Sequence, residues 1–146
     1  MGTNNTFTSG GSRELNLELL IMRLACALPF IYHGAAILFG AFGGPGPVNF
    51  AAFIKAPVII GYLVGLAQFA GGLAILLGAL LRVGAICVIM VMLGAIFLVH
   101  LPNGYDIGHG GMEYALTELL LAGGLLLSGP GKFSLGSILP GPLQKL

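Results

Sequence analysis

Charged residues are scarce in this sequence: Asp, Glu, Lys and Arg together make up 8% of its 146 residues, with no cluster of Lys or Arg. Without such a cluster the chain lacks the electrostatic footprint of nucleic-acid binding, so no nucleic-acid partner is expected. Tryptophan is absent, and the two cysteines, Cys26 and Cys87, form no Cys-x-x-Cys dithiol pair. Both cysteines are interpreted as buried, inert thiols.

Hydrophobic residues, by contrast, make up 57% of the sequence and give it a mean hydropathy of +1.00. Ordinary soluble domains of this size do not approach such values, so we predict an integral membrane protein. The apolar residues form four continuous runs, unlike the alternating pattern of a transmembrane barrel. Each run has about 17 to 24 residues, which can span or nearly span a hydrocarbon core about 30 Å thick as a helix. The predicted helices are residues 17–39, 58–81, 83–101 and 112–128.

The predicted fold is therefore all-α, an integral membrane four-helix bundle that occupies residues 17–135 as one domain. Residues 1–16 are expected to be a flexible arm, because a stretch rich in Gly, Asn, Thr and Ser buries too little surface to order itself. Residues 136–146 form a tail. Small residues allow helices to approach closely in lipid, and two stripes of them are candidates for packing faces. These stripes are Gly61, Gly65, Gln68 and Gly72 on the second helix, and Gly84, Cys87, Val91 and Gly94 on the third.

Positive charges are distributed unevenly between the two sides of this predicted bundle. The two loops 40–57 and 102–111 contain only Lys55. The arm, the turn between the second and third helices and the tail contain the other terminal and loop cations: Arg13, Arg82, Lys132 and Lys145. The positive-inside rule therefore predicts a multi-pass protein of the plasma or inner membrane with both termini in the cytoplasm.

The first outer loop is predicted to contain a short helix of its own. It begins with Phe42-Gly43-Gly44-Pro45-Gly46-Pro47, where glycine and proline interrupt the preceding helix. In residues 48–55, Asn49 can act as the N-cap, and Phe50, Phe53 and Ile54 share one face. We therefore expect an interfacial helix that lies on the outer leaflet.

A small set of polar side chains is predicted to line a pocket near the outer surface: His33, Gln68, His100, Glu113 and Glu118. Among them Glu118 is unusual, because it lies about a turn and a half inside an apolar helix, too deep to cap it. Such a carboxylate needs a partner, a wet cavity or a bound proton. His33 is the predicted partner, because Gly34 beside it allows a neighbouring group to approach closely. The pair would join the first and fourth helices.

Several of these polar residues also have structural explanations. Arg23 lies within reach of the cytoplasmic headgroups and can snorkel to them. Glu113 lies in the first turn of the fourth helix, where a carboxylate stabilises the helix N-terminus. His100 precedes a helix end, and Asp106 and His109 lie in a glycine-rich loop where water can solvate them. Gln68, finally, can simply tie the second helix to a neighbour.

A metal site is a weaker alternative. His33, His100, His109 and Glu113 would be its ligands, and the last two have helical i, i+4 spacing if the fourth helix begins early. However, the sequence contains no compact metal motif. It also lacks a glycine-rich phosphate loop and a nucleophile elbow.

Six segments between residues 17 and 135 carry a family resemblance. They are Arg23-Leu24, His33-Gly34, Phe42-Gly43-Gly44-Pro45-Gly46, Gly65-Leu66-Ala67-Gln68-Phe69-Ala70-Gly71-Gly72, His100-Leu101-Pro102-Asn103-Gly104 and Gly110-Gly111-Met112-Glu113-Tyr114-Ala115-Leu116. With these segments the chain resembles the DoxX family of small four-helix membrane proteins, which is related to the DoxD and DoxA subunits of a membrane thiosulfate:quinone oxidoreductase. The resemblance implies redox and sulfur chemistry at the membrane. The family often carries Glu where this chain has Gln68, and no thiosulfate-binding motif can be carried over.

Our leading hypothesis is a membrane subunit of a quinone-linked oxidoreductase, acting on thiosulfate-type sulfur compounds or in redox stress. Glu118 and His33 would exchange protons with the quinone headgroup, and Gln68, His100 and Glu113 would bind it. No covalently bound cofactor is expected. Because the sequence shows no flavin, haem or iron–sulfur ligands, electron transfer would need quinone together with a partner protein or a directly reducing substrate.

Two other functions stay open at this point. The chain can be a non-catalytic accessory or scaffold subunit of a larger complex, in which the polar cluster only fixes helix register. Its partners would then be the lipid bilayer and either another protein or further copies of itself, packed through glycine-rich faces. A small-solute or proton pathway would need polar groups that also reach the inner side, and only Arg23 and Gln68 point that way.

Overall fold

A computed structural model describes residues 10–143, without the side chain of Ser137, and every regular element in this part of the chain is a helix. The prediction of an all-helical fold is confirmed for these residues. One short helix and four longer ones account for most of them: α1 (Gly10–Phe39), α2 (Gly46–Phe53), α3 (Val58–Leu77), α4 (Leu81–Ala95) and α5 (Glu113–Ser128).

The first helix begins at Gly10, seven residues before the predicted start at Leu17. Residues 10–16 thus belong to α1 and not to a flexible arm, whereas the rest of the predicted arm, residues 1–9, lies outside the described residues. A contact from the far end of the chain holds this first part of α1, because the Asn16 side-chain oxygen accepts a hydrogen bond of 2.6 Å from the backbone N–H of Lys132.

The α3 helix, which corresponds to the predicted helix 58–81, ends at Leu77 and not at Leu81. Gly78 follows with φ +65°, the left-handed conformation that terminates helices and that glycine adopts without steric cost. The chain then turns and begins α4 at Leu81. A hydropathy pattern cannot locate this boundary, because the turn is as apolar as the helices on either side.

Among the described residues, three helices are long and apolar enough to cross a membrane: Ser12–Phe39, Val58–Leu77 and Leu81–Asn103. The last of these combines α4 with the short π and 3-10 turns that extend it. The α5 helix has 16 residues, which gives a length of about 24 Å against a hydrocarbon core of about 30 Å. Three apolar spans support a multi-pass membrane protein, while a fourth crossing by α5 stays a prediction.

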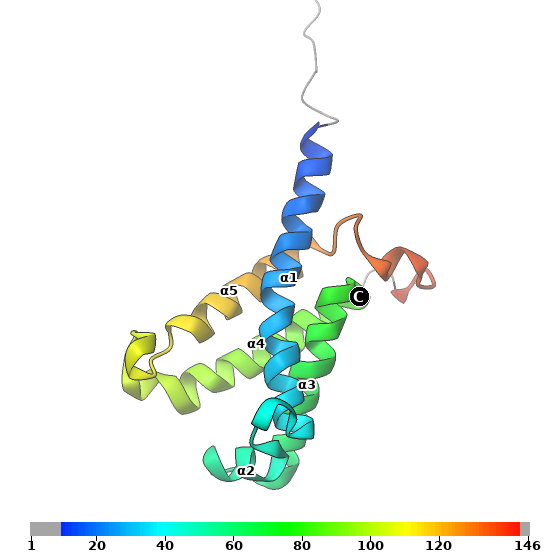
Figure 1. Ribbon diagram of the computed structural model, residues 1–146. Coiled ribbons are helices and arrows are strands. Elements are labelled where there is room, and N and C mark those ends of the chain that lie inside the picture. Colours follow the sequence, from blue (N-terminus) through cyan, green and yellow to red (C-terminus); the bar gives the residue numbers. More distant parts are fainter. Residues whose placement is uncertain (1–9, 144–146) are drawn as a thin grey trace, which may run out of the picture.

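The most extensive helix contact joins α1 and α3, which run side by side (Figure 1). A Cβ atom on Gly34 would lie 2.7 Å from Cα of Phe69, and one on Gly72 would lie 2.9 Å from the Ile31 side chain. Gly65 packs in the same way against α1, beside Ile37. The predicted stripe of small residues on residues 58–81, which form α3, is therefore a packing face.

The contact between α3 and α4 also depends on glycine. A Cβ on Gly84 would lie 2.6 Å from the carbonyl oxygen of Gly71. The stripe predicted on α4 is only partly correct, because Val88 is fully buried there, whereas a Cβ on Gly94 would meet no atom of a neighbouring segment within 4 Å. The physical reason is that α4 leaves α3 well before Gly94.

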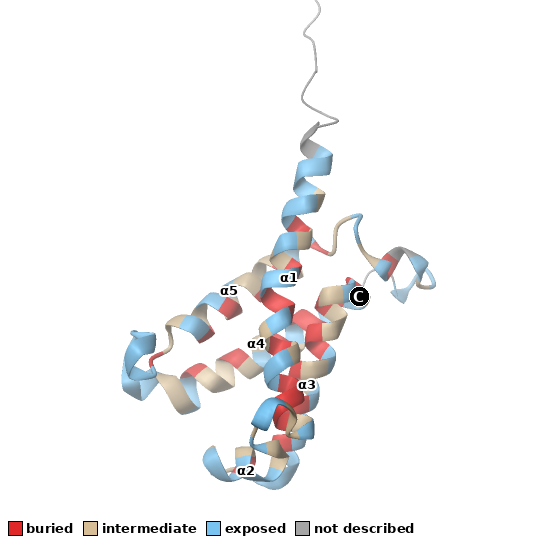
Figure 2. Cartoon of the chain, viewed as in Figure 1, coloured by how far each residue is buried: buried red, intermediate tan, exposed pale blue. Residues whose placement is uncertain are grey.

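The α4 and α5 helices pair with each other and lead away from α1 and α3 at a wide angle (Figure 1). Helices α1 and α5 touch only over a short stretch. Burial is deepest where the two pairs cross and falls toward the loop that joins α4 to α5 (Figure 2). The compact four-helix bundle predicted from the sequence is thus not confirmed, because hydropathy does not encode the angle at which helices cross.

The predicted short helix in the first loop is present as α2. It begins at Gly46, and Asn49 is not its N-cap: Asn49 lies inside the helix, and its side-chain amide donates a 2.9 Å hydrogen bond to the Pro45 carbonyl oxygen. The residue that fixes α2 is Ala51, which is fully buried and packs beside Gly61 of α3. Phe53 is largely exposed, and its placement at a membrane interface stays a prediction.

Candidate functional site

Glu118 occupies the second turn of α5 and is 5% exposed. Its neighbours on the same helix face, Ala115 and Ala122, are buried as well. A spacing of three and four residues places all three on one side of the helix, against α1 and α4. Glu118 therefore points into the protein.

Two polar groups surround this carboxylate. The Cys26 thiol of α1 and the Tyr114 hydroxyl, one turn earlier on α5, are the groups that interact with the Glu118 carboxylate. Oxygen Oε2 of Glu118, however, has no hydrogen-bond partner among the residues that the structure describes. Such an orphaned buried oxygen is rare and costs free energy, so it calls for a specific explanation.

The Glu118 site extends from the interior to the helix surface. Cys26 is completely buried, whereas Tyr114 is 39% exposed on the outside of α5. The predicted burial of both thiols is confirmed for Cys26 but not for Cys87, which is only partly buried, and their chemical inertness stays a prediction. The site thus offers a buried thiol, a carboxylate with one free oxygen and a phenol that the surroundings can reach.

The predicted pair of Glu118 and His33 is not formed. His33 lies seven residues after Cys26 on α1, which is about 10 Å further along the helix axis. Its ring is exposed and packs edge to face against the ring of Tyr32, with 5.3 Å between the centroids. Seven residues are nearly two full turns, so Cys26 and His33 share a helix face. The oblique course of α5 therefore decides that Cys26, and not His33, lies beside Glu118.

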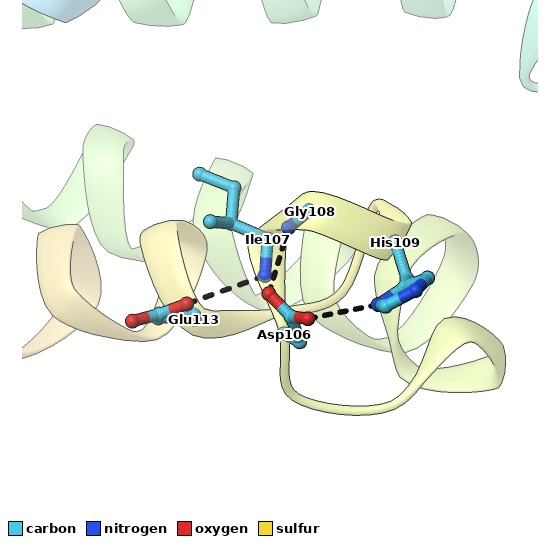
Figure 3. Close-up of polar contacts among 5 residues, drawn as sticks. All are labelled: Asp106, Ile107, Gly108, His109 and Glu113. Atoms are coloured by element: carbon cyan, nitrogen blue, oxygen red, sulfur yellow. Dashed lines mark hydrogen bonds and ion pairs between the residues drawn. The ribbon is translucent and has the colours of Figure 1, made fainter.

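His100 and Glu113 belong to a different part of the molecule, the loop between α4 and α5. Here α4 continues as a π-helical turn, Ile96–His100. The His100 ring donates a 2.8 Å hydrogen bond from Nδ1 to the Gly110 carbonyl oxygen, which also accepts one of 3.3 Å from the Asn103 side chain. Glu113 accepts a 3.2 Å hydrogen bond from the backbone N–H of Ile107 (Figure 3). Both predicted binding residues therefore hold the loop together.

Asp106 organises the tip of the same loop (Figure 3). Its carboxylate accepts 2.8 Å hydrogen bonds from the Gly108 backbone and from Nδ1 of His109. Gly111 packs so tightly that a Cβ there would lie 2.6 Å from the Gly104 carbonyl oxygen. The loop is thus solvent-exposed, as predicted for Asp106 and His109, yet it is held in one shape by its own side chains.

The predicted pocket and the metal alternative both required side chains that the structure keeps apart. Gln68 is buried on the face of α3 that packs against α1, and it is not among the groups that interact with Glu118, which are Cys26 and Tyr114. His33 lies on α1, whereas His100, His109 and Glu113 lie in the α4–α5 loop. Within the described part of the chain, no group of three His, Cys, Asp or Glu side chains could hold a metal ion.

Arg23 forms the second buried polar centre, near the end of α3. It is 2% exposed, and its guanidinium donates to backbone carbonyl oxygens only: Ile75 at 2.8 Å, Pro130 at 3.1 Å, Phe133 at 2.5 Å, and Leu76. The predicted structural role of Arg23 agrees with these bonds, and its predicted snorkelling to the headgroups stays a prediction. Arg23 joins the last turn of α3 to the segment after α5, where the helix dipole favours a cation.

The comparisons with known proteins bear on the first part of the chain. The sequence model of the DoxX family matches residues 18–101, which is more than half of the chain and covers α1 to the π-helical turn after α4. No curated protein and no solved structure matches. The extent of the family match, together with three apolar spans, is sufficient for an assignment: this chain belongs to the DoxX family of membrane proteins.

Proposed function

We propose that the protein is a membrane subunit of a quinone-linked oxidoreductase, and that Glu118 is the proton-exchanging residue of its quinone headgroup site. The observation that carries this proposal is the buried oxygen Oε2, which has no partner among the described residues. A carbonyl or hydroxyl headgroup would supply the missing hydrogen bond, and a carboxyl group can hold or release a proton at that atom. Membership of the DoxX family supports the membrane setting of such a reaction.

Each residue of the revised site has a separate task. Tyr114, partly exposed on α5, is the point at which a headgroup arriving from the lipid first meets a hydrogen-bonding group. Cys26 closes the buried side of the site and orients the Glu118 carboxyl group. The surrounding alanines and Leu125 exclude water, so that protons exchange through Glu118. Compared with the sequence-based hypothesis, Cys26 and Tyr114 replace His33, while His100 and Glu113 are assigned to the loop.

Quinone, when bound, would supply the electron acceptor, taking up two electrons and two protons to give quinol. The electrons must come from outside this chain, through a partner subunit or a reducing substrate. A sulfur compound of the thiosulfate type is the class that the family resemblance favours. Glu118 would transfer protons to or from the headgroup oxygen, which couples the electron donor to the membrane quinone pool.

The test begins with purification of the protein in a mild detergent and chemical analysis of the quinone that co-purifies. We expect the unsubstituted protein to retain quinone, Glu118→Gln to lose most of it, and Tyr114→Phe to bind less. Glu113→Gln is the matched control, because it alters the other carboxylate of α5 and should retain quinone. The proposal is wrong if no quinone is bound and Glu118→Gln leaves the reduction of quinone to quinol by the membranes unchanged.

The second candidate function is a non-catalytic accessory or scaffold subunit. It is favoured by the number of polar residues that serve only the fold, since Arg23, His100 and Glu113 all bond to backbone groups. In that case Glu118→Gln and His33→Ala would lower the yield of folded protein, and the activity of the complex would follow the amount of protein. A variant with normal yield but altered quinone binding would decide against the scaffold.

A further inference from the structure

A shallow groove of about 480 Å³ lies at the end of α3, and its lining includes none of the residues of the Glu118 site. One part of its wall is apolar and comes from Leu20, Leu76 and Leu77. The other part brings two cations together, Arg23 of α1 and Lys132 of the segment after α5. Hydrophobic and positively charged groups thus share one depression that is open on one side.

The positive charge of this groove has no anionic partner in the described part of the chain. Arginine is always charged, and Arg23 donates only to backbone carbonyls. Glu14 and Glu18 lie nearest along α1, but both are exposed and neither forms an ion pair with Arg23. The remaining acidic residues, Asp106, Glu113 and Glu118, are engaged in the α4–α5 loop or beside Cys26.

The position of Lys132 is fixed rather than incidental. Its backbone N–H donates to the Asn16 side chain, and the carbonyl of the next residue, Phe133, accepts from Arg23. The Lys132 side chain itself is exposed. The same two contacts that anchor the segment after α5 therefore place Lys132 in the lining of a groove that the buried Arg23 also lines.

The groove also lies near the ends of two apolar spans. Leu77 is the last residue of one apolar span, and the span Ser12–Phe39 passes Leu20 within three turns of its beginning. This end of the helices is the one predicted to face the cytoplasm. Basic pockets between helices at that surface suit the headgroups of anionic lipids, whose acyl chains need an apolar wall beside the phosphate.

We propose that this groove binds an anionic phospholipid, with Lys132 contacting the phosphate, Arg23 adding its positive field, and an acyl chain lying along Leu20, Leu76 and Leu77. The bound lipid would compensate the charge of Arg23 and link α1, α3 and the segment after α5. The site is separate from the one proposed for quinone, and either can exist without the other.

The test measures thermal unfolding and lipid retention of the full chain in detergent, with phosphatidylglycerol or phosphatidylcholine of identical acyl chains added. We expect phosphatidylglycerol to raise the melting temperature and to remain bound in native mass spectra, and phosphatidylcholine to do neither. Lys132→Ala should weaken phosphatidylglycerol binding about fivefold, the effect of removing one cation near a lipid headgroup. This variant leaves the backbone hydrogen bonds of Lys132 and Arg23 in place.

Arg82→Ala is the matched control, because Arg82 is an exposed cation at the start of α4, on the same side as the groove but outside its lining. It should bind phosphatidylglycerol as the unsubstituted protein does. Equal losses in the two variants would mean general surface attraction and would overturn the site, as would equal binding of the two lipids. Stabilisation by inorganic phosphate as large as by phosphatidylglycerol would overturn the assignment to a lipid.

Discussion

Arg23 and Glu118 are the two buried ionisable side chains of opposite charge among the described residues, 2% and 5% exposed. They lie on helices that touch, and Cys26, one turn from Arg23, is the residue of α1 that meets Glu118. Arg23 donates hydrogen bonds to carbonyl oxygens, whereas oxygen Oε2 of Glu118 has no hydrogen-bond partner among the same described residues. Two side chains that are similarly buried thus have different roles. A charged group whose hydrogen bonds the backbone satisfies stabilises the fold, whereas a buried polar atom without a partner is available to bind a ligand.

The largest expected effect is on the satisfied charge. Replacing Arg23 by Met keeps most of the length of the side chain but leaves the carbonyls of Ile75, Leu76, Pro130 and Phe133 without this donor. Because leaving buried acceptors unpaired is costly, we expect the free energy of unfolding to fall by about 3 kcal/mol or more. Thermal unfolding in detergent measures this change.

Two further variants give that result its meaning. Arg23→Lys should be intermediate, because an ammonium group cannot reach acceptors spread over a planar guanidinium. Arg82→Met removes an exposed cation at the same end of the helices and should change stability by less than about 0.5 kcal/mol. If Arg23→Met unfolded at the same temperature as the unsubstituted protein, the assignment of Arg23 to the fold would fail.

The next effect concerns the α1–α3 contact, which positions Arg23 against α3. Gly34→Ala places a methyl group 2.7 Å from Cα of Phe69, so the two helices must separate. Overpacking of this kind lowers the free energy of unfolding by about 1 to 3 kcal/mol. Gly94→Ala is the control, since its Cβ meets nothing within 4 Å, and alanine in a helix should stabilise by up to about 1 kcal/mol. Opposite shifts in melting temperature are expected, and a stable Gly34→Ala variant would contradict the close contact.

The third effect concerns the Glu118 carboxylate, whose replacement should change quinone binding and not stability. Glu118→Gln keeps the shape and removes the charge, and a neutral amide costs less to bury than a carboxylate. We therefore expect the free energy of unfolding to stay within about 1 kcal/mol of the original or to rise, while bound quinone is lost. Melting temperature and quinone content are measured on the same preparation. A loss of stability as large as that of Arg23→Met would place Glu118 with the structural residues.

The fold was predictable as far as it depends on local pattern. Continuous apolar runs predicted the helices, and glycine spacing predicted the face of α3 that meets α1. The beginning of α1 was not predictable, because Asn16 depends on Lys132, which lies 116 residues away. The oblique course of α4 and α5 could not be derived either, since two helices of the same hydropathy can cross at several angles.

Of the candidate site, Glu118 could be predicted from the sequence, but the residues that surround it could not. The depth of Glu118 in an apolar helix identified it, because no cap explains a carboxylate there. Its partners depend on which turn of α1 meets α5, and parallel helices would have brought His33, not Cys26, to that level. The hydrogen-bond acceptors of Arg23 could not be predicted either, because they are backbone carbonyls at a helix end, which any residue type can provide.

The smallest effect is expected in the α4–α5 loop, where Asp106 is largely exposed. Asp106→Ala removes the acceptor for Gly108 and His109, but backbone hydrogen bonds from Gly111 to the Asp106 carbonyl and from Glu113 to Tyr105, each 2.9 Å, stay in place. Exposed pairs contribute little, so the free energy of unfolding should fall by at most about 1 kcal/mol. Amide hydrogen exchange should quicken within the loop alone, and quinone content should not change. If Asp106→Ala instead released quinone at unchanged stability, the loop would belong to the binding site after all, and the separation drawn between its satisfied side chains and Glu118 would have to be abandoned.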